Sequence, residues 1–291
     1  MTGQLPIRRR LLGRSLRNYR EAMGYGLQDA AELLRCDRSK LSRIETGQRG
    51  ISAQDLRALL DEYGVPRAEQ EALAAIAHHG RDDGWWRGYQ DVLSAAGLDL
   101  AIMEASATEI LGFDAQLIPE LLRTEDYARA VADADLGRSA DSPRDRVVES
   151  TLIRQAVVLG DRHASVRVVV AEGALRQMVG GPEVMRRQLR RLANLGDENG
   201  SPVGDVTVQV LPFRQGAHAV AGTGAVTLLR FATVPGLGVV HLGGLSGGAS
   251  LDAPEDLARY ARALEMLRMT ALTPADSVKL LRDMARALPR G

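Results

Sequence analysis

Apolar residues near the start of the chain recur at the spacing of short amphipathic helices. Between Ile7 and Met23 the large apolar side chains return every three to four residues, the period of a helix with one buried face. Three shorter helices are expected to follow, over residues 27–34, 38–45 and 52–63. Asp37 and Ser52 stand directly before two of them, where a side-chain oxygen can accept hydrogen bonds from the free amides of a first turn. The pattern therefore predicts a compact helical head.

The rest of the chain mixes the helical period with short apolar runs. Helices are expected over residues 69–79, 99–112, 118–131, 144–159, 182–195, 254–269 and 274–288, and strands over 166–170, 206–211, 225–231 and 237–242. The strand segments are β-branched or apolar runs bounded by Gly, Pro or Asp. A polar, glycine-containing break at residues 79–84 is typical of a domain boundary. We therefore predict an all-α helix-turn-helix domain over residues 1–66, a helical connector over 67–83 and a larger α+β domain over 84–291.

The connection between the second and third predicted helices has the length found in a helix-turn-helix. Only residues 35–37 separate the two segments. Leu41 and Ile44, three residues apart, would bury one side of the third helix. Its other faces carry the polar residues Arg38, Ser39, Lys40, Ser42 and Arg43. A helix that is anchored on one side and polar on the other is what a major-groove reader requires.

These polar residues suit different parts of a DNA duplex. Arg38 can donate two hydrogen bonds to one guanine, and Ser39 and Ser42 can donate to or accept from either type of base pair. Lys40 and Arg43 are expected at phosphates, which set the register but carry no sequence information. The alternative interpretation is a charged helix face that meets only solvent. The short turn and the spacing of the apolar residues favour DNA binding.

Charge is distributed unevenly along the chain. The formal net charge of all 291 residues is zero, but residues 1–50 alone carry +6 and the remainder carries −6. Phosphate neutralisation supplies most non-specific DNA affinity, so a basic head on an acidic body suits a polyanion partner. Hydrophobic residues make up 45% and charged residues 25%, which indicates a folded globular chain.

The remaining composition bears on location. Cys36 is the single cysteine and cannot form an internal disulfide bond. The first residues lack the apolar run of a signal peptide, and we find no apolar stretch long enough to cross a membrane. A cytoplasmic protein is expected.

Several segments together resemble a known family. They are LRNYREAMGYGLQDAAELLRCDRSKLSRIETGQRG in the head, and GWWRGY, LIPELLRTEDYARA, the dipeptide Arg154-Gln155, VGGPEVMRRQLRRL and VTVQVLPFRQGAH in the body. In these segments the chain resembles the XRE-type (lambda and 434 repressor-like) helix-turn-helix regulators of actinomycetes with an uncharacterised C-terminal sensor-like domain. RSKLSRIETG is the most specific part of the match.

The resemblance implies roles for particular residues. Arg20 and Glu45 fall where such repressors place a structural ion pair that ties the first helix to the end of the third. Many relatives begin the second helix with a glutamine that binds a phosphate; this chain has Leu27 there, and Gln28 is the residue that could replace that contact. Arg35 stands where relatives have a turn glycine. Homodimerisation is implied by analogy with the family.

The expected function is a homodimeric, sequence-specific transcriptional regulator that binds double-stranded DNA. Its body would sense a small-molecule effector or a partner protein, and relatives are often encoded beside a small acidic partner. One alternative is therefore a protein-interaction module, and another is an enzyme domain fused to a DNA-binding head. His218 close to an acidic residue such as Asp205 would support the enzyme. We expect no enzyme, metal site or cofactor, because the histidines lack metal-type spacing and no nucleophile motif accompanies them.

Overall fold

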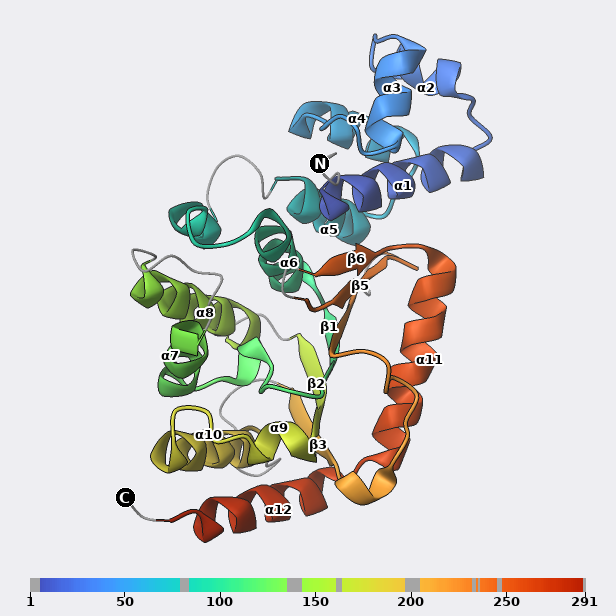
Figure 1. The fold of residues 1–291 in the computed structure, drawn as a ribbon. Helices are drawn as coiled ribbons and strands as arrows, with labels where there is room; N and C mark the ends of the chain where they lie inside the picture. Colours follow the sequence, from blue (N-terminus) through green and yellow to red (C-terminus); the bar gives the residue numbers. More distant parts are fainter. Residues whose placement is uncertain are drawn as a thin grey trace.

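The computed structural model describes residues 6–78, 84–134, 143–160, 164–196, 205–231, 234, 236–244 and 248–289 (Figure 1). The head consists of α1 (Ile7–Ala22), α2 (Leu27–Leu33), α3 (Arg38–Glu45), α4 (Ala53–Glu62) and α5 (Arg67–His78). The predicted caps are present: the Asp37 carboxylate accepts from the Lys40 amide at 2.7 Å and the Ser52 hydroxyl from the Asp55 amide at 3.0 Å. Gly47, just past α3, has a φ of +75°, which a residue without Cβ adopts at no steric cost.

The head is held by one apolar core. Leu11 and Leu16 of α1 pack with Leu41 of α3, and all three are 0% exposed. Met23 was expected on this buried side, but it is 48% exposed because α1 ends before it. Helix α5 contacts both α1 and α4, and its Leu73 lies in the same core. The domain limits at residues 66 and 83 stay predictions.

The body combines helices and strands, as the α+β prediction required. Its helices are η1 (Trp85–Tyr89), α6 (Ala95–Ser106), η2 (Glu120–Leu122), α7 (Glu125–Ala134), α8 (Arg144–Leu159), α9 (Glu172–Arg176), α10 (Pro182–Leu195), η3 (Phe213–Gln215), α11 (Pro254–Thr270) and α12 (Pro274–Ala287). Its strands are β1 (Glu109–Asp114), β2 (Ser165–Ala171), β3 (Val206–Leu211), β4 (Ala225–Arg230), β5 (Gly238–Leu242) and β6 (Ala249–Leu251).

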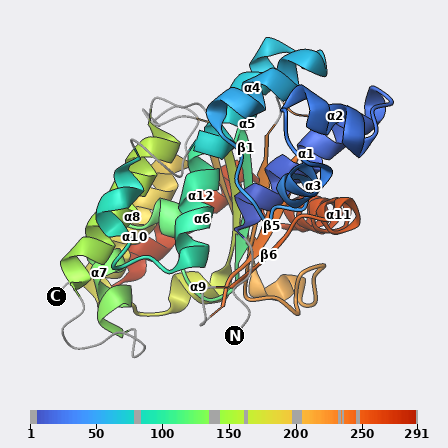
Figure 2. The same cartoon turned by 90° about the horizontal axis from the view of Figure 1, so that it is seen from above.

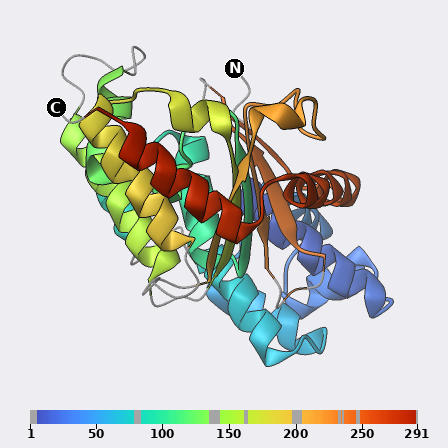
Figure 3. The same ribbon diagram turned by 90° about the horizontal axis from the view of Figure 1, so that it is seen from below.

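Among the described residues the strands form one mixed sheet of order β3-β2-β1-β4-β5-β6. β1, β2 and β3 run parallel, whereas β4, β5 and β6 pair antiparallel with their neighbours. Helices α7, α8, α10 and α12 cover one face, and α11 covers the other (Figures 2 and 3). Accordingly Ile110 and Val168 belong to one apolar cluster, and Leu111, Phe113 and the α11 residue Leu264 to a second.

Strand β1 contradicts the helix that was expected over residues 99–112. The helix ends at Ser106, and residues 109–114 form a strand in the middle of the sheet. Its residues 110–113 are buried on both faces, so they show no alternation of apolar and polar side chains. A short apolar run of this kind has the same appearance in a buried helix and in a central strand. The three-residue edge strand β6 was also not predicted.

The head rests on the body through the N-terminal half of α1. The Ile7 amide donates to Asp99 Oδ2 at 3.0 Å, and Arg8 Nε lies 3.4 Å from Asp99 Oδ1. Arg10 NH2 donates to Asp252 Oδ1 at 3.2 Å, and Arg14 NH1 lies 3.5 Å from Asp252 Oδ2. Burial raises the pKa of the Asp99 carboxyl. We call Asp99 and Asp252 the docking acids. In the described residues no helix is both long and apolar enough to cross a membrane.

Candidate nucleic-acid interface

The turn between α2 and α3 is tight and brings the two helices into contact. The Cys36 amide donates to the Ala31 carbonyl at 3.0 Å, and Arg35 takes a φ of +48°. Among the described residues, Arg35 is the one non-glycine residue with a positive φ. It stands at the position where relatives were expected to have glycine. Ala31 and Leu41 are 0% exposed, so the small side chain of α2 lies in the core with α3. The turn and this packing set the direction in which α3 points.

Helix α3 has one buried side and one open side. Leu41 and Ile44 are buried at 0% and 2% exposure, as their spacing predicted. Arg38, Ser39 and Arg43 are exposed on the open side. Figure 1 shows α2 and α3 on the part of the head that lies away from the sheet. The body therefore leaves this face of α3 uncovered.

The six residues expected to contact DNA differ in their solvent exposure and in their partners within the protein. Gln28, Arg38, Ser39 and Arg43 are exposed, whereas Lys40 and Ser42 are half-buried. Gln28 Nε2 donates to Glu32 Oε1 at 2.9 Å, and Arg43 Nε donates to the Ser39 carbonyl at 3.3 Å. Arg38 has no ion-pair partner within the described ranges. Its guanidinium is therefore available to an outside acceptor.

Lys40 is held by another helix. Its Nζ lies 3.4 Å from Asp55 Oδ2 of α4. A phosphate contact by Lys40 would have to compete with this ion pair. Arg49, which we did not include among the expected contacts, is exposed, and its amide donates to the Arg43 carbonyl at 2.9 Å. It adds a cation beside the end of α3. The sequence signal for it was a basic residue two positions after Gly47.

The Arg20 and Glu45 pair implied by the resemblance forms in the structure. Arg20 Nε donates to Glu45 Oε1 at 2.7 Å, and NH2 donates to Oε2 at 3.0 Å. A further hydrogen bond joins Arg20 NH1 to the Tyr25 carbonyl at 2.7 Å. The hydrogen bond to Glu45 raises the pKa of the Arg20 guanidinium, and burial raises the pKa of nearby Tyr63 to about 12. Both ends of the pair are buried, so it ties the end of α1 to the end of α3.

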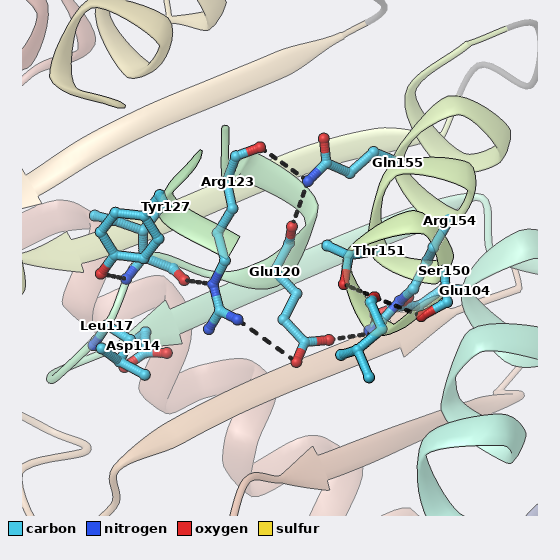
Figure 4. A network of polar contacts seen from close by, with 12 residues as sticks. Glu104, Asp114, Leu117, Glu120, Arg123, Tyr127, Ser150, Thr151, Arg154 and Gln155 are labelled. Carbon is cyan, nitrogen blue, oxygen red and sulfur yellow. Dashed lines mark hydrogen bonds and ion pairs between the residues drawn. The ribbon is translucent and has the colours of Figure 1, made fainter. Parts of the chain in front are cut away.

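The body carries a second polar cluster, buried between helices (Figure 4). Arg154 of α8 donates to both carboxylate oxygens of Glu104 of α6 and also to Glu120 of η2. The Glu104 side chain is 2% exposed and the Arg154 side chain 9%, whereas that of Glu120 is 46% exposed. The charge of Arg154 lowers the pKa of the Glu120 carboxyl. This bidentate pairing satisfies a charge that would otherwise be costly to bury.

The same cluster brings together three of the body segments that resemble the family: LIPELLRTEDYARA, the dipeptide Arg154-Gln155 and VGGPEVMRRQLRRL. Gln155 Nε2 donates to the carbonyls of Glu120 and Arg123, at 2.7 and 3.0 Å. Gln188 of α10 donates to the Leu122 carbonyl at 2.9 Å and accepts from the Thr124 amide at 2.7 Å. The LIPELLRT segment is therefore held by side chains of α8 and α10. Sequence spacing did not suggest this role for Arg154.

His218 and Asp205, named above as a pair that would support an enzyme, do not come together in the structure. His218 packs its ring on Phe113, near the carboxyl end of β1, whereas Asp205 precedes the amino end of β3. Because β1 and β3 run parallel, Asp205 and His218 lie at opposite ends of the strands. His241 is buried, and its Nδ1 lies 3.1 Å from the Ser250 hydroxyl. Burial lowers its pKa, and the charge of Arg154 adds to this effect. No group of three potential metal ligands occurs in the described residues.

Comparison with known families finds one match in the head and one in the body. A family model for a helix-turn-helix domain matches residues 11–73. A second family model, a domain of unknown function (DUF5753), matches residues 98–283. Neither a curated protein nor a solved structure showed significant similarity to the chain.

Proposed function

Because the chain belongs to the DUF5753 family and carries a helix-turn-helix DNA-binding domain in front of it, we propose that it is a sequence-specific transcriptional regulator. The observation that supports this most directly is the open face of α3. It presents Arg38, Ser39 and Arg43 to solvent while Leu41 and Ile44 anchor the helix from behind. This is the arrangement of a recognition helix in the major groove.

The residues of this face divide into base readers and phosphate binders. Arg38 and Ser39 lie in the first turn of α3, where side chains of a recognition helix meet base edges. Arg43 lies in the last turn and suits a phosphate, as do Gln28 at the start of α2 and Lys40 once it leaves Asp55. We expect the Ser42 hydroxyl to form a hydrogen bond with either a base or a phosphate.

We further propose that the regulator acts as a homodimer in the cytoplasm, with a body that responds to an effector. Helix-turn-helix proteins of this class read two half-sites with two copies of the head. The body, with its six described strands and the helices on both sheet faces, is larger than dimerisation alone requires. A small molecule and a partner protein are both candidates for what it senses.

A gel-shift titration against genomic fragments, including the gene's own promoter, tests DNA recognition. We expect a complex that is selective for sequence and weakens as salt is raised, because cations are released from the phosphates on binding. Retention of every fragment with equal affinity, or of none, would contradict the proposal.

The division of roles leads to a prediction for two arginines. Arg38→Ala should lower affinity for the best site by about 1 to 3 kcal/mol and relax specificity at one base step. Arg43→Ala should weaken binding to all DNA sequences alike and reduce the salt dependence of the affinity. Competition gel shifts against single-base variants of the site measure both effects. The assignment of roles is wrong if the two variants behave in the same way.

A further inference from the structure

A cavity of about 580 Å³ opens beside the first turns of α11. It lies at the end of the sheet where β1 begins and β4 ends. Its lining residues are Thr108, Glu109, Leu228, Arg230, Phe231, Val234, Gly236, Leu237, Gly238, Leu257, Ala258 and Ala261. Most of these side chains are apolar, and the only charged ones are Glu109 and Arg230. Small-molecule sites have volumes of roughly 300 to 1,000 Å³ and a similar apolar wall with few polar groups.

The polar end of the cavity has an excess of positive charge. Glu109 Oε1 lies 3.0 Å from Arg167 NH1, and Glu109 Oε2 lies 2.8 Å from Arg230 NH1. One carboxylate is thus shared by two guanidinium groups, which leaves one positive charge uncompensated within this trio. The Arg230 side chain is 44% exposed, and a guanidinium has more donors than the single one that Glu109 uses. A ligand carboxylate suits the fork-like geometry of these donors.

Two of the segments that line the cavity connect along the chain to the docking acids. Leu257 lines the cavity in the first turns of α11, and Asp252, which holds Arg10 and Arg14, precedes this helix by two residues. On the other side, Thr108 follows α6, the helix that carries Asp99. In Figure 1, α6 and the start of α11 both lie at the end of the body that faces the head. A molecule lodged in the cavity would therefore contact the first turns of α11 and the residues that directly follow α6, and through them could act on the two helices next to the docking acids.

We propose that this cavity is the effector site of the body and that it binds a small, mainly apolar molecule with a single carboxylate. Arg230 receives the carboxylate, and the α11 side of the cavity receives the apolar part. The coupling of this site to DNA affinity through the docking acids rests on the proposed function. Binding to the cavity does not.

Binding is tested by calorimetric titration of the full chain with decanoate and with the uncharged decan-1-ol, without DNA. We expect the wild type to bind one decanoate per chain. Arg230→Gln should weaken the affinity for decanoate at least tenfold and leave the affinity for decan-1-ol unchanged. Ala258→Trp should abolish binding of both, because Ala258 is an exposed lining residue and indole fills the space. Ala275→Trp and Arg190→Gln are matched controls at exposed positions outside the cavity, and both should bind like the wild type.

The proposal is overturned if the wild type does not bind decanoate, or if Ala258→Trp binds it normally while its unfolding temperature matches that of Ala275→Trp. If Arg230→Gln lowers the affinity for decanoate and for decan-1-ol equally, the role of the arginine is overturned. Gel shifts with added decanoate then test the coupling, with an expected change in DNA affinity of fivefold or more. A chain that binds decanoate but no DNA contradicts the proposed function alone. A chain that binds both independently contradicts the coupling.

Discussion

At the scale of single residues, the turn before α3 contains a side chain in an unfavourable backbone conformation. Arg35 has a φ of +48°, where an L-residue brings its Cβ too close to the following carbonyl. The turn retains hydrogen bonds on both sides: the Arg35 amide donates to Glu32 and the Cys36 amide to Ala31. The tight geometry required by the helix-turn-helix is therefore maintained at a local energetic cost.

Arg35→Gly should raise the free energy of unfolding by about 0.5 to 1 kcal/mol. Removal of the left-handed strain gains roughly 1 to 2 kcal/mol, which exceeds the extra conformational entropy that glycine loses on folding. Urea denaturation followed by circular dichroism measures the difference. Arg35→Ala is the control, since it removes the charge and retains the Cβ, and we expect little change. A gain of the same size in Arg35→Ala would show that charge and not backbone strain is responsible.

At the scale of elements, α1 and α3 are joined by close backbone contact as well as by the ion pair of Arg20 and Glu45. A Cβ built on Gly13 would lie 2.5 Å from the carbonyl oxygens of Ile44 and Glu45. Real Cβ atoms do not come this close to a backbone oxygen. The two helices can therefore lie this close together only if residue 13 is glycine. The position of α3 thus depends on a residue outside it.

Gly13→Ala should lower the free energy of unfolding by about 1 to 3 kcal/mol, because α3 must move away from α1. This loss should exceed the gain in helix propensity that alanine brings. DNA affinity should fall with it, since the displaced α3 no longer meets the groove. Gly50→Ala is the matched control, because Gly50 is exposed and nothing lies within 4 Å of the added Cβ. Equal stability of Gly13→Ala and Gly50→Ala would refute the close contact.

At the scale of the whole molecule, the head and the body share the apolar cluster that contains Leu16 and Met103, and electrostatic contacts between opposite charges join them further. The basic N-terminal half of α1 meets the docking acids, so the +6 and −6 segments attract each other at their junction. The participating side chains are 15% to 29% exposed, which leaves them partly screened by solvent. The electrostatic part of this joint should therefore respond to salt concentration.

Replacing both docking acids, Asp99→Asn with Asp252→Asn, should weaken the joint between the head and the body. The loss is expected to be about 1 to 2 kcal/mol, since each partly exposed ion pair contributes up to about 1 kcal/mol. Differential scanning calorimetry should then show the head melting in a separate, earlier transition. High salt should produce the same separation in the wild type. The double variant Asp91→Asn with Asp145→Asn removes exposed ion pairs inside the body and should keep the wild-type profile. An unchanged profile in the docking-acid variant would contradict the joint.

Much of the head could be predicted because its signals are local. The caps at Asp37 and Ser52 act on amides three residues away, and the buried pair Leu41 and Ile44 lies within one helical turn. Strand β1 could not be predicted in this way. Its apolar run is buried by contacts with β2 and β4, whose residues lie more than 50 positions further along the chain.

The order of residues along the chain was enough to establish the helices of the head, the outward arginines of α3 and the mixed character of the body. These features arise from interactions over a few residues, where spacing alone limits what can form. The ion pair of Lys40 with Asp55, the buried Arg154 cluster, the docking acids and the cavity beside α11 became visible only in three dimensions. Each unites segments that are distant in the chain, and folding brings such segments together through packing that no local pattern records.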